Sequence, residues 1–199
     1  MKYSHTITSL FPKIGNMKHK RVITSSGRFI DIYDDVFPHY LREHHIHFIQ
    51  RSNYKLGSRS SGLIWQKDKT NFQFLFSEED LNKFRFISDE LLSKLKDHEI
   101  VSCWSLASSP FSTYYYHSDS SALNCISLLY YVNTRWDKNW GGETLFANDE
   151  GECEIAVEYK PGRVVLFDSL IPHKPSPVSM QADEFRFTFV IVMKPKVNN

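Results

Sequence analysis

The sequence predicts a mainly β protein with flanking helices, built around a double-stranded β-helix (jelly roll) core. From residue 100 onward, short apolar stretches alternate with turn residues, and no helical periodicity intervenes. Helical periodicity is confined to the first half of the chain. At 199 residues, the chain is long enough for one domain with a full hydrophobic core. A run of about eight short strands is typical of two facing sheets that enclose a pocket.

We therefore expect a single domain over residues 1–199. Residues 1–99 would supply an N-terminal strand, supporting helices and a lid, and residues 100–193 would form the jelly-roll core. The strands expected in this core lie near residues 100–106, 113–119, 124–132, 143–147, 154–159, 163–168 and 185–193.

In the first half, residues 1–27 are mildly basic and are expected to form a solvated arm, with a contact to nucleic acid or a partner as the alternative. Residues 28–33 alternate as in a strand. A helix is expected from Pro38, in its first turn, to about residue 50. Residues 53–72 carry Gly57, Gly62 and several serines around Trp65, which predicts a long loop with one short strand that could act as a lid.

A second helix is expected to begin at Ser77. This serine is a good N-cap, and the acidic residues that follow it favour the first helical turn. Apolar residues then recur at helical spacing to about Lys96. The helix is predicted to brace one sheet from outside.

Composition excludes several classes of protein. With 24 basic and 23 acidic residues, the net charge is +1, so no overall field favours nucleic acid or a membrane. Cys103, Cys125 and Cys153 are odd in number and widely spaced, as expected for reduced thiols of a cytoplasmic protein. No apolar stretch reaches 18 residues, so we expect neither a transmembrane helix nor a signal peptide.

The stretch Tyr-Tyr-Tyr-His117-Ser-Asp119 has the strongest chemical signal in the chain. In a β-strand, residues two apart point to the same face, so His117 and Asp119 would project side by side. A third ligand from another strand would complete a face of two histidines and one carboxylate, as in non-haem Fe(II) sites. His173, which follows a predicted strand and Pro172, is the expected third ligand, against the alternative of a simple turn histidine.

Two further features bear on binding sites. The helix after Pro38 carries four histidines, namely His39, His44, His45 and His47. They lack an i, i+4 pair, so a solvated or hydrogen-bonded helix face is expected instead of a metal site. On the last strand, Arg186 lies among phenylalanines and must find an anion if it is buried, because an unpaired guanidinium is costly. A protein carboxylate is the alternative partner.

Five pieces of sequence, taken in order, indicate a family. They are His117-Ser-Asp119, Leu-Leu-Tyr-Tyr131-Val-Asn, Trp136-Asp-Lys-Asn-Trp140-Gly-Gly-Glu-Thr-Leu-Phe, Pro-Gly-Arg-Val-Val-Leu-Phe167 with Pro172-His173, and Arg186-Phe-Thr188. Over about residues 100–193 the chain resembles the 2-oxoglutarate- and Fe(II)-dependent dioxygenases, and within them the prolyl 4-hydroxylase-like group.

The resemblance implies roles for six residues. His117, Asp119 and His173 would bind Fe(II) as the catalytic triad. Cosubstrate contacts are implied for Arg186, Thr188 and Tyr131, with Arg186 on the distal carboxylate of 2-oxoglutarate. The gap of 13 residues from His173 to Arg186 is longer than is usual in the group, which makes Lys174 the nearest substitute.

For Tyr131 the alternative role is core packing. Tyr115 is expected at the pocket, and Trp136 and Trp140 are either substrate contacts or loop anchors. The pair Gly141-Gly142 is expected at a turn that admits close backbone approach.

The implied activity is hydroxylation of a C–H bond coupled to conversion of 2-oxoglutarate to succinate and CO2. The cofactors implied are Fe(II), 2-oxoglutarate and O2, with ascorbate as an optional addition. A prolyl or other amino-acid side chain is the expected substrate, in a peptide or a small molecule, with no membrane or nucleic-acid partner. The alternatives are a non-catalytic jelly-roll binding module with a relic metal site and a nucleic-acid base demethylase.

Overall fold

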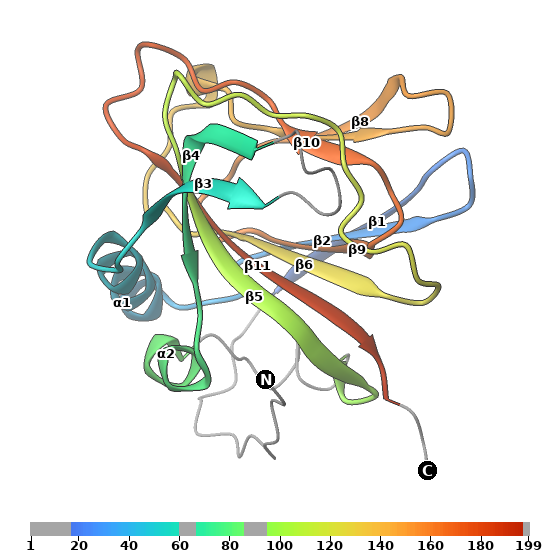
Figure 1. Cartoon of the computed structure of the whole chain (residues 1–199), viewed down its shortest axis with the longest axis horizontal. Coiled ribbons are helices and arrows are strands. Elements are labelled where there is room, and N and C mark those ends of the chain that lie inside the picture. Colours follow the sequence, from blue (N-terminus) through green and yellow to red (C-terminus); the bar gives the residue numbers. More distant parts are fainter. Residues whose placement is uncertain (1–16, 60–66, 86–94, 197–199) are drawn as a thin grey trace.

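The computed structural model describes residues 17–59, 67–85 and 95–196 (Figure 1). The strands are β1 (Lys18–Ile23), β2 (Phe29–Asp34), β3 (Lys55–Arg59), β4 (Lys67–Leu75), β5 (His98–Ser108), β6 (Ile126–Tyr131), β7 (Thr144–Ala147), β8 (Cys153–Val157), β9 (Val164–Asp168), β10 (His173–Pro175) and β11 (Arg186–Pro195). The helices are α1 (His39–Gln50), α2 (Glu78–Phe84) and a 3-10 turn at Lys138–Trp140.

The strands form two antiparallel sheets that face one another. The large sheet has the order β1-β2-β9-β6-β11-β5-β4-β3, and the small sheet has the order β10-β7-β8. In Figure 1 the small sheet lies above the large one, and α1 and α2 lie on the other side of the large sheet. The molecule is thus a jelly roll with helices on one outer face, as the sequence predicts.

Alternation along the central strands separates two cores. On β11, Phe187 and Phe189 pack with α1 and α2, whereas Val190 packs between the two sheets with Phe146 of β7. Arg186 and Thr188 have the parity of Val190, so they face the space between the sheets. Side chains at this inner face are therefore the ones that can build a pocket.

Two helix predictions need correction in detail. Pro38 is the N-cap of α1 and lies just outside its first turn. The Ser77 cap is confirmed and forms a capping box with Asp80. However, Arg85 adopts a left-handed conformation (φ 53°) and ends α2 at Phe84, so the predicted continuous helix is wrong at this point. Residues 86–94 lie outside the described residues.

The predicted loop at residues 53–72 is wrong, because β3 and most of β4 lie in this range and pair with each other. As the outermost strand of the large sheet, β3 can carry Gly57 and polar residues without the alternation that identifies buried strands. Gly62 and Trp65 lie outside the described residues. The predicted arm at residues 1–27 is likewise wrong from Lys18 onward, where β1 forms the other edge of the sheet.

The strand predicted at residues 113–119 is also wrong. Only His117 forms an isolated bridge, with His173. This bridge continues β10, a three-residue strand that the sequence does not predict because it is short and ends in Pro175. The other six predicted core strands are confirmed within a few residues.

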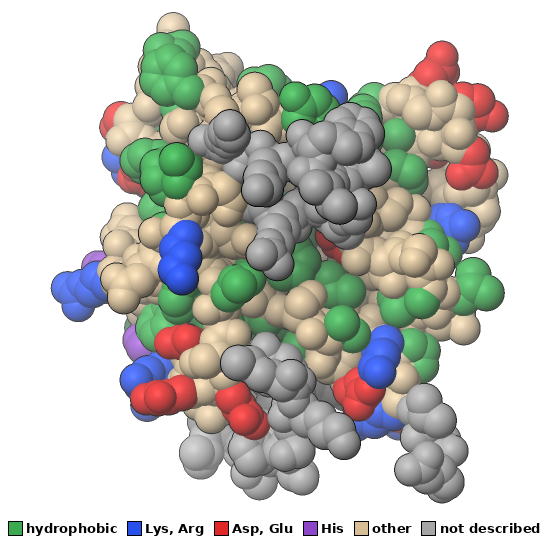
Figure 2. Space-filling view, in the orientation of Figure 1, with side chains coloured by type: hydrophobic (Ala, Val, Ile, Leu, Met, Phe, Trp, Pro, Cys, Tyr) green, Lys and Arg blue, Asp and Glu red, His purple; other side chains and the backbone are tan. Residues whose placement is uncertain are grey.

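The surface is mixed in charge. On the face shown in Figure 2, Lys and Arg side chains are interspersed with Asp and Glu among the described residues. No helix in the described part of the chain is both long and apolar enough to cross a lipid bilayer.

Candidate metal centre and cosubstrate pocket

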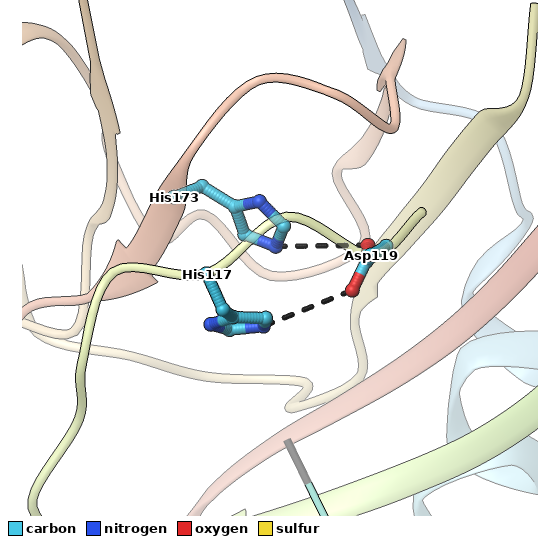
Figure 3. Close-up of side chains that lie close together, drawn as sticks. All are labelled: His117, Asp119 and His173. Carbon is cyan, nitrogen blue, oxygen red and sulfur yellow. Dashed lines mark ion pairs between the residues drawn. The ribbon is translucent and has the colours of Figure 1, made fainter. Parts of the chain in front are cut away.

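Three side chains predicted to be ligands meet between the sheets (Figure 3). His117 Nε2 lies 3.7 Å from Asp119 Oδ1, and His173 Nε2 lies 3.6 Å from Asp119 Oδ2. The side chains of Asp119 and His173 are buried, whereas the side chain of His117 is 30% exposed. Among these three residues, His117 is therefore the one most open to solvent.

Backbone hydrogen bonds hold these residues together in place of the expected strand. The N–H groups of His117 and His173 each donate to the carbonyl oxygen of the other residue, at 3.1 and 2.9 Å. The N–H of Asp119 donates to the carbonyl oxygen of Ser169 at 3.0 Å. The Ser118 hydroxyl donates to the carbonyl oxygen of Leu170 at 2.9 Å. The segment around His117 is thus fixed along the residues that precede β10.

Each imidazole ring is oriented by a hydrogen bond to the carbonyl oxygen two residues earlier in the chain. Nδ1 of His117 donates to the carbonyl oxygen of Tyr115 at 3.1 Å, and Nδ1 of His173 donates to that of Ile171 at 3.0 Å. Because a carbonyl oxygen only accepts, Nδ1 carries a proton, and in the neutral ring Nε2 then keeps its lone pair. Burial also lowers the pKa of His173 to about 4, against the opposing effect of Asp119, so this ring is neutral near pH 7.

These three residues fit a metal ion. Their ligand atoms all lie within 4.8 Å of one another, and within the described residues no other three histidine, cysteine or carboxylate side chains are grouped in this way. Two neutral imidazole nitrogens and one carboxylate oxygen are the donors of a facial triad, which leaves three positions of an octahedral ion free for other ligands. The donor chemistry therefore matches the Fe(II) site expected from the sequence.

Arg186 lies at the start of β11 on the same inner face and is 1% exposed. Its Nε donates to the carbonyl oxygen of Gly142 at 2.8 Å, and one Nη lies 3.4 Å from the hydroxyl oxygen of Thr144. The guanidinium also contacts the rings of Tyr131 and Tyr159. Throughout the described part of the chain, no carboxylate forms an ion pair with Arg186. A buried cation with no paired carboxylate can bind an anionic ligand.

Tyr131 and Thr188 lie on the same inner face as this cation. Tyr131 is fully buried, and its hydroxyl donates to Thr144 Oγ1 at 2.8 Å. Burial raises the pKa of the Tyr131 phenol, so it remains a hydrogen-bond donor. Thr188 is opposite Tyr131 in the β11–β6 pairing and is 1% exposed. The three residues expected to contact the cosubstrate therefore lie together.

Sequence reasoning missed Thr144, Tyr159 and Ser127. Thr144 accepts the Tyr131 hydrogen bond and lies near Arg186. Tyr159 stacks on Tyr131 with ring centroids 4.4 Å apart. Ser127 donates to Asp119 at 2.6 Å. Alternation on β7 places Thr144 on the same face as Phe146, which is a signal that could have identified it.

The turn after Trp136 supports Arg186 through its glycines. Gly142 has φ 82°, and a Cβ atom there would lie 3.0 Å from Arg186 Cδ, so the predicted close approach is confirmed. The Trp136 indole N–H donates to the carbonyl oxygen of Gly141 at 2.9 Å, and Trp140 packs edge-to-face on Trp136. Trp136 is thus an anchor of this turn. Tyr115, which is expected at the pocket, is 57% exposed and therefore lies at the surface of the molecule.

Comparisons with known proteins agree with this architecture. Residues 105–193 match the profile of the 2OG-Fe(II) oxygenase superfamily. A search of curated protein sequences found no significant match.

Solved structures resemble the chain over most of its length. A prolyl hydroxylase from Trichoplax adhaerens, in complex with a hypoxia inducible factor peptide fragment, is 15% identical with a TM-score of 0.64, covering 83% of each chain. A Pseudomonas putida prolyl-4-hydroxylase is 17% identical with a TM-score of 0.58, covering 84% of this chain and 92% of its own. HygX from Streptomyces hygroscopicus, with nickel and 2-oxoglutarate bound, is 13% identical with a TM-score of 0.60, covering 84% and 83%.

The profile match contains all three residues of the metal-ligand group, Tyr131 and Arg186. The identities of the solved structures are low, so these structures establish the fold: a jelly roll shared with prolyl 4-hydroxylase-like proteins. The profile match over residues 105–193 and the shared fold support a 2-oxoglutarate-dependent dioxygenase, and over that range the chain is similar to the 2OG-Fe(II) oxygenase superfamily.

Proposed function

We propose that this dioxygenase hydroxylates a prolyl or other amino-acid side chain, with Fe(II) held by His117, Asp119 and His173. The observation that carries the proposal is the position of two complementary features between the same sheets. One is a group of two histidines and one carboxylate, and the other is a buried arginine with no ion-paired carboxylate among the described residues. An anionic ligand that reached from the metal ion to the Arg186 guanidinium would occupy both features.

The protein residues position the reactants. His117 and His173 present Nε2 lone pairs because their Nδ1 protons are held by backbone carbonyls. Fe(II) bound there would supply the chemistry that activates O2 and couples the decarboxylation of 2-oxoglutarate to C–H hydroxylation. Arg186 would bind the distal carboxylate through the nitrogens that point away from Gly142. The Tyr131 hydroxyl would become a second donor if its proton turned from Thr144 Oγ1 to the carboxylate.

The surroundings exclude water from the inner side of the site. Phe146 and Phe167 pack against the His173 ring, with centroids 5.8 and 4.8 Å away. Both phenylalanines are fully buried. Such walls lower the local dielectric, which strengthens the interaction between Arg186 and a carboxylate. Within the described residues, the side of His117 and the exposed Tyr115 would then be the one that admits the substrate.

A peptide is the first substrate class to examine. Two of the structural relatives are prolyl hydroxylases, one of them bound to a peptide fragment. A small molecule is the second class, since HygX has also been determined with hygromycin B bound. Trp140, which packs against Arg135 and Trp136, lies on the same turn as Gly142 and is a candidate substrate contact.

The test is turnover of 2-oxoglutarate by the full chain with Fe(II), ascorbate and O2. Succinate should form, and its rate should rise when a hydroxylated substrate is present. Panels of proline-containing peptides and free amino acids would be scored by a mass gain of one oxygen atom. Binding of Fe(II) and 2-oxoglutarate without any succinate would support the non-catalytic binding module instead.

A further inference from the structure

The Asp119 carboxylate receives a hydrogen bond from a buried chain of two serines. The Ser127 hydroxyl on β6 donates to Asp119 Oδ2 at 2.6 Å. The hydroxyl oxygens of Ser127 and Ser169 are 2.8 Å apart. Both serines are 0% exposed. Ser127 reaches Asp119 because it has the parity of Leu129 and Tyr131, which face the space between the sheets.

The direction of this chain follows from the number of protons. An ionised carboxylate only accepts hydrogen bonds, so the single proton of Ser127 is directed to Asp119. The Ser127 oxygen can then only accept from Ser169, whose hydroxyl donates to it. The order is therefore Ser169 to Ser127 to Asp119, with a charge-assisted bond at its end.

Ser169 also holds Asp119 through the backbone. Its carbonyl oxygen accepts from the N–H groups of Asp119 and Ser120, at 3.0 and 3.4 Å. Its own N–H donates to the carbonyl oxygen of Cys125, just before β6. The main chain and the side chain of Asp119 are thus fixed by two serines that lie next to each other.

We propose that Ser127 and Ser169 are positioning residues that keep Asp119 a one-oxygen ligand, with Oδ1 directed to the metal. This inference rests on the proposed metal site. Each oxygen faces one imidazole, since Oδ1 lies 3.7 Å from His117 Nε2 and Oδ2 lies 3.6 Å from His173 Nε2. The difference between them is that Oδ2 also accepts the Ser127 hydrogen bond, which leaves Oδ1 as the freer donor to a metal ion. A carboxylate that bound through both oxygens would occupy one of the three positions that the triad leaves open. Fewer positions would then remain for 2-oxoglutarate and O2.

The proposal can be tested with Mn(II) on the full chain, without turnover. Two quantities are measured: the Kd for Mn(II) and the relaxation of water protons per bound ion, which reports the number of metal-bound waters. Ser127→Ala should raise Kd about 10- to 100-fold. It should also lower the relaxation per bound ion, by about a third if Oδ2 displaces one of three waters. Ser127→Thr keeps the hydroxyl and should restore both values.

Ser105→Ala is the matched control. Ser105 is also 0% exposed and its hydroxyl is 2.7 Å from that of Tyr54, but it has the parity of Cys103 and Ala107, which pack on the helix side. Its loss should affect stability and leave Mn(II) binding unchanged. Ser169→Ala removes only the second link and should give a smaller change than Ser127→Ala.

Three outcomes would overturn the proposal. The first is an unchanged Kd for Mn(II) in Ser127→Ala, and the second is an equal rise of that Kd in Ser105→Ala. The third is a higher Kd in Ser127→Ala with unchanged water-proton relaxation per bound ion, which contradicts the one-oxygen ligand. Failure of the metal site itself looks different. In that case the wild-type chain would bind no Mn(II), or His117→Ala would bind it as well as the wild type.

Discussion

Two groups of histidines in this molecule differ in what their ring nitrogens contact. His117 and His173 each use Nδ1 for a carbonyl oxygen two residues earlier and direct Nε2 toward Asp119. On α1, His45 uses both nitrogens within the fold: Nε2 donates to the carbonyl oxygen of Arg85, and Nδ1 accepts from the Tyr130 hydroxyl. His44 donates from Nε2 to the carbonyl oxygen of Lys83.

Among the described residues, the denser group does not bring three ligand side chains together. Four histidines within nine residues attract attention in the sequence, but none of them lies with two further ligand side chains in the described part of the structure. The pair His117 and His173 is separated by 56 positions and is brought together by one isolated bridge. A site requires converging lone pairs and a carboxylate, which local density of one residue type does not supply.

The largest effect is expected from removing a ligand of the sparser group. His117→Ala, Asp119→Ala and His173→Ala should each abolish 2-oxoglutarate turnover and Fe(II) binding while the protein stays folded, because each removes one of three donors. Fe(II) titration, turnover and circular dichroism measure these three properties. The double variant His44→Ala/His47→Ala is the control and should bind Fe(II) normally. Activity in two of the three ligand variants would refute the triad.

The next largest effect concerns the anion site. Arg186→Ala should weaken 2-oxoglutarate binding by about 30-fold to several-thousand-fold, because a carboxylate loses its partner in a buried pocket. Fe(II) binding should be unchanged, since Arg186 contacts none of the three ligands. Arg186→Lys should recover only part of the loss, because an ammonium lacks the planar fork. Titration of both ligands on each variant separates the two sites; normal 2-oxoglutarate binding would direct attention to Lys174.

The comparison also shows what the sequence could reveal. Period-two alternation identified the central strands and placed Arg186 and Thr188 on one face, because both sides of these strands are covered by apolar layers. The two-residue spacing of His117 and Asp119 identified them as neighbours, although the strand predicted at residues 113–119, on which that inference rested, does not form. Their common direction comes from hydrogen bonds to the segment 169–173.

Long-range contacts were beyond sequence reasoning. Ser127 and Asp119 are only eight residues apart, yet their contact depends on the turn that leads into β6. The buried state of His45 depends on Tyr130, which is 85 positions away. Neither local pattern nor composition contains that information. Edge strands such as β3 were missed for a different reason: one exposed edge relaxes the pattern that marks a buried strand.

A smaller effect on the anion site is expected from the turn that supports it. Gly142→Ala should weaken 2-oxoglutarate binding by about tenfold, because the new Cβ would lie 3.0 Å from Arg186 Cδ and displace the guanidinium. Gly151→Ala is a matched control: its φ of 84° gives the same backbone strain, of about 1–2 kcal/mol, but no atom lies within 4 Å of the Cβ. Equal 2-oxoglutarate affinity in the two variants would exclude the contact with Arg186 as the cause.

The least effect on function is expected at the other histidine group, where His45 contributes to acid sensitivity. Burial lowers the pKa of His45 to about 3, from 6.5. Between these values the unfolded chain binds a proton that the folded chain does not, so stability falls as the pH decreases below about 6.5 and is unaffected above it. The slope from one such group is at most about 1.4 kcal/mol per pH unit.

His45→Gln should reduce this slope of the unfolding free energy against pH, measured by urea unfolding between pH 6.5 and 4.5, without changing Fe(II) binding. Some slope should remain, since the pKa of His173 is also lowered. His39→Gln, which alters an exposed histidine at the start of α1, should reproduce the wild-type slope. Parallel curves for all three proteins would show that His45 is not the titrating group.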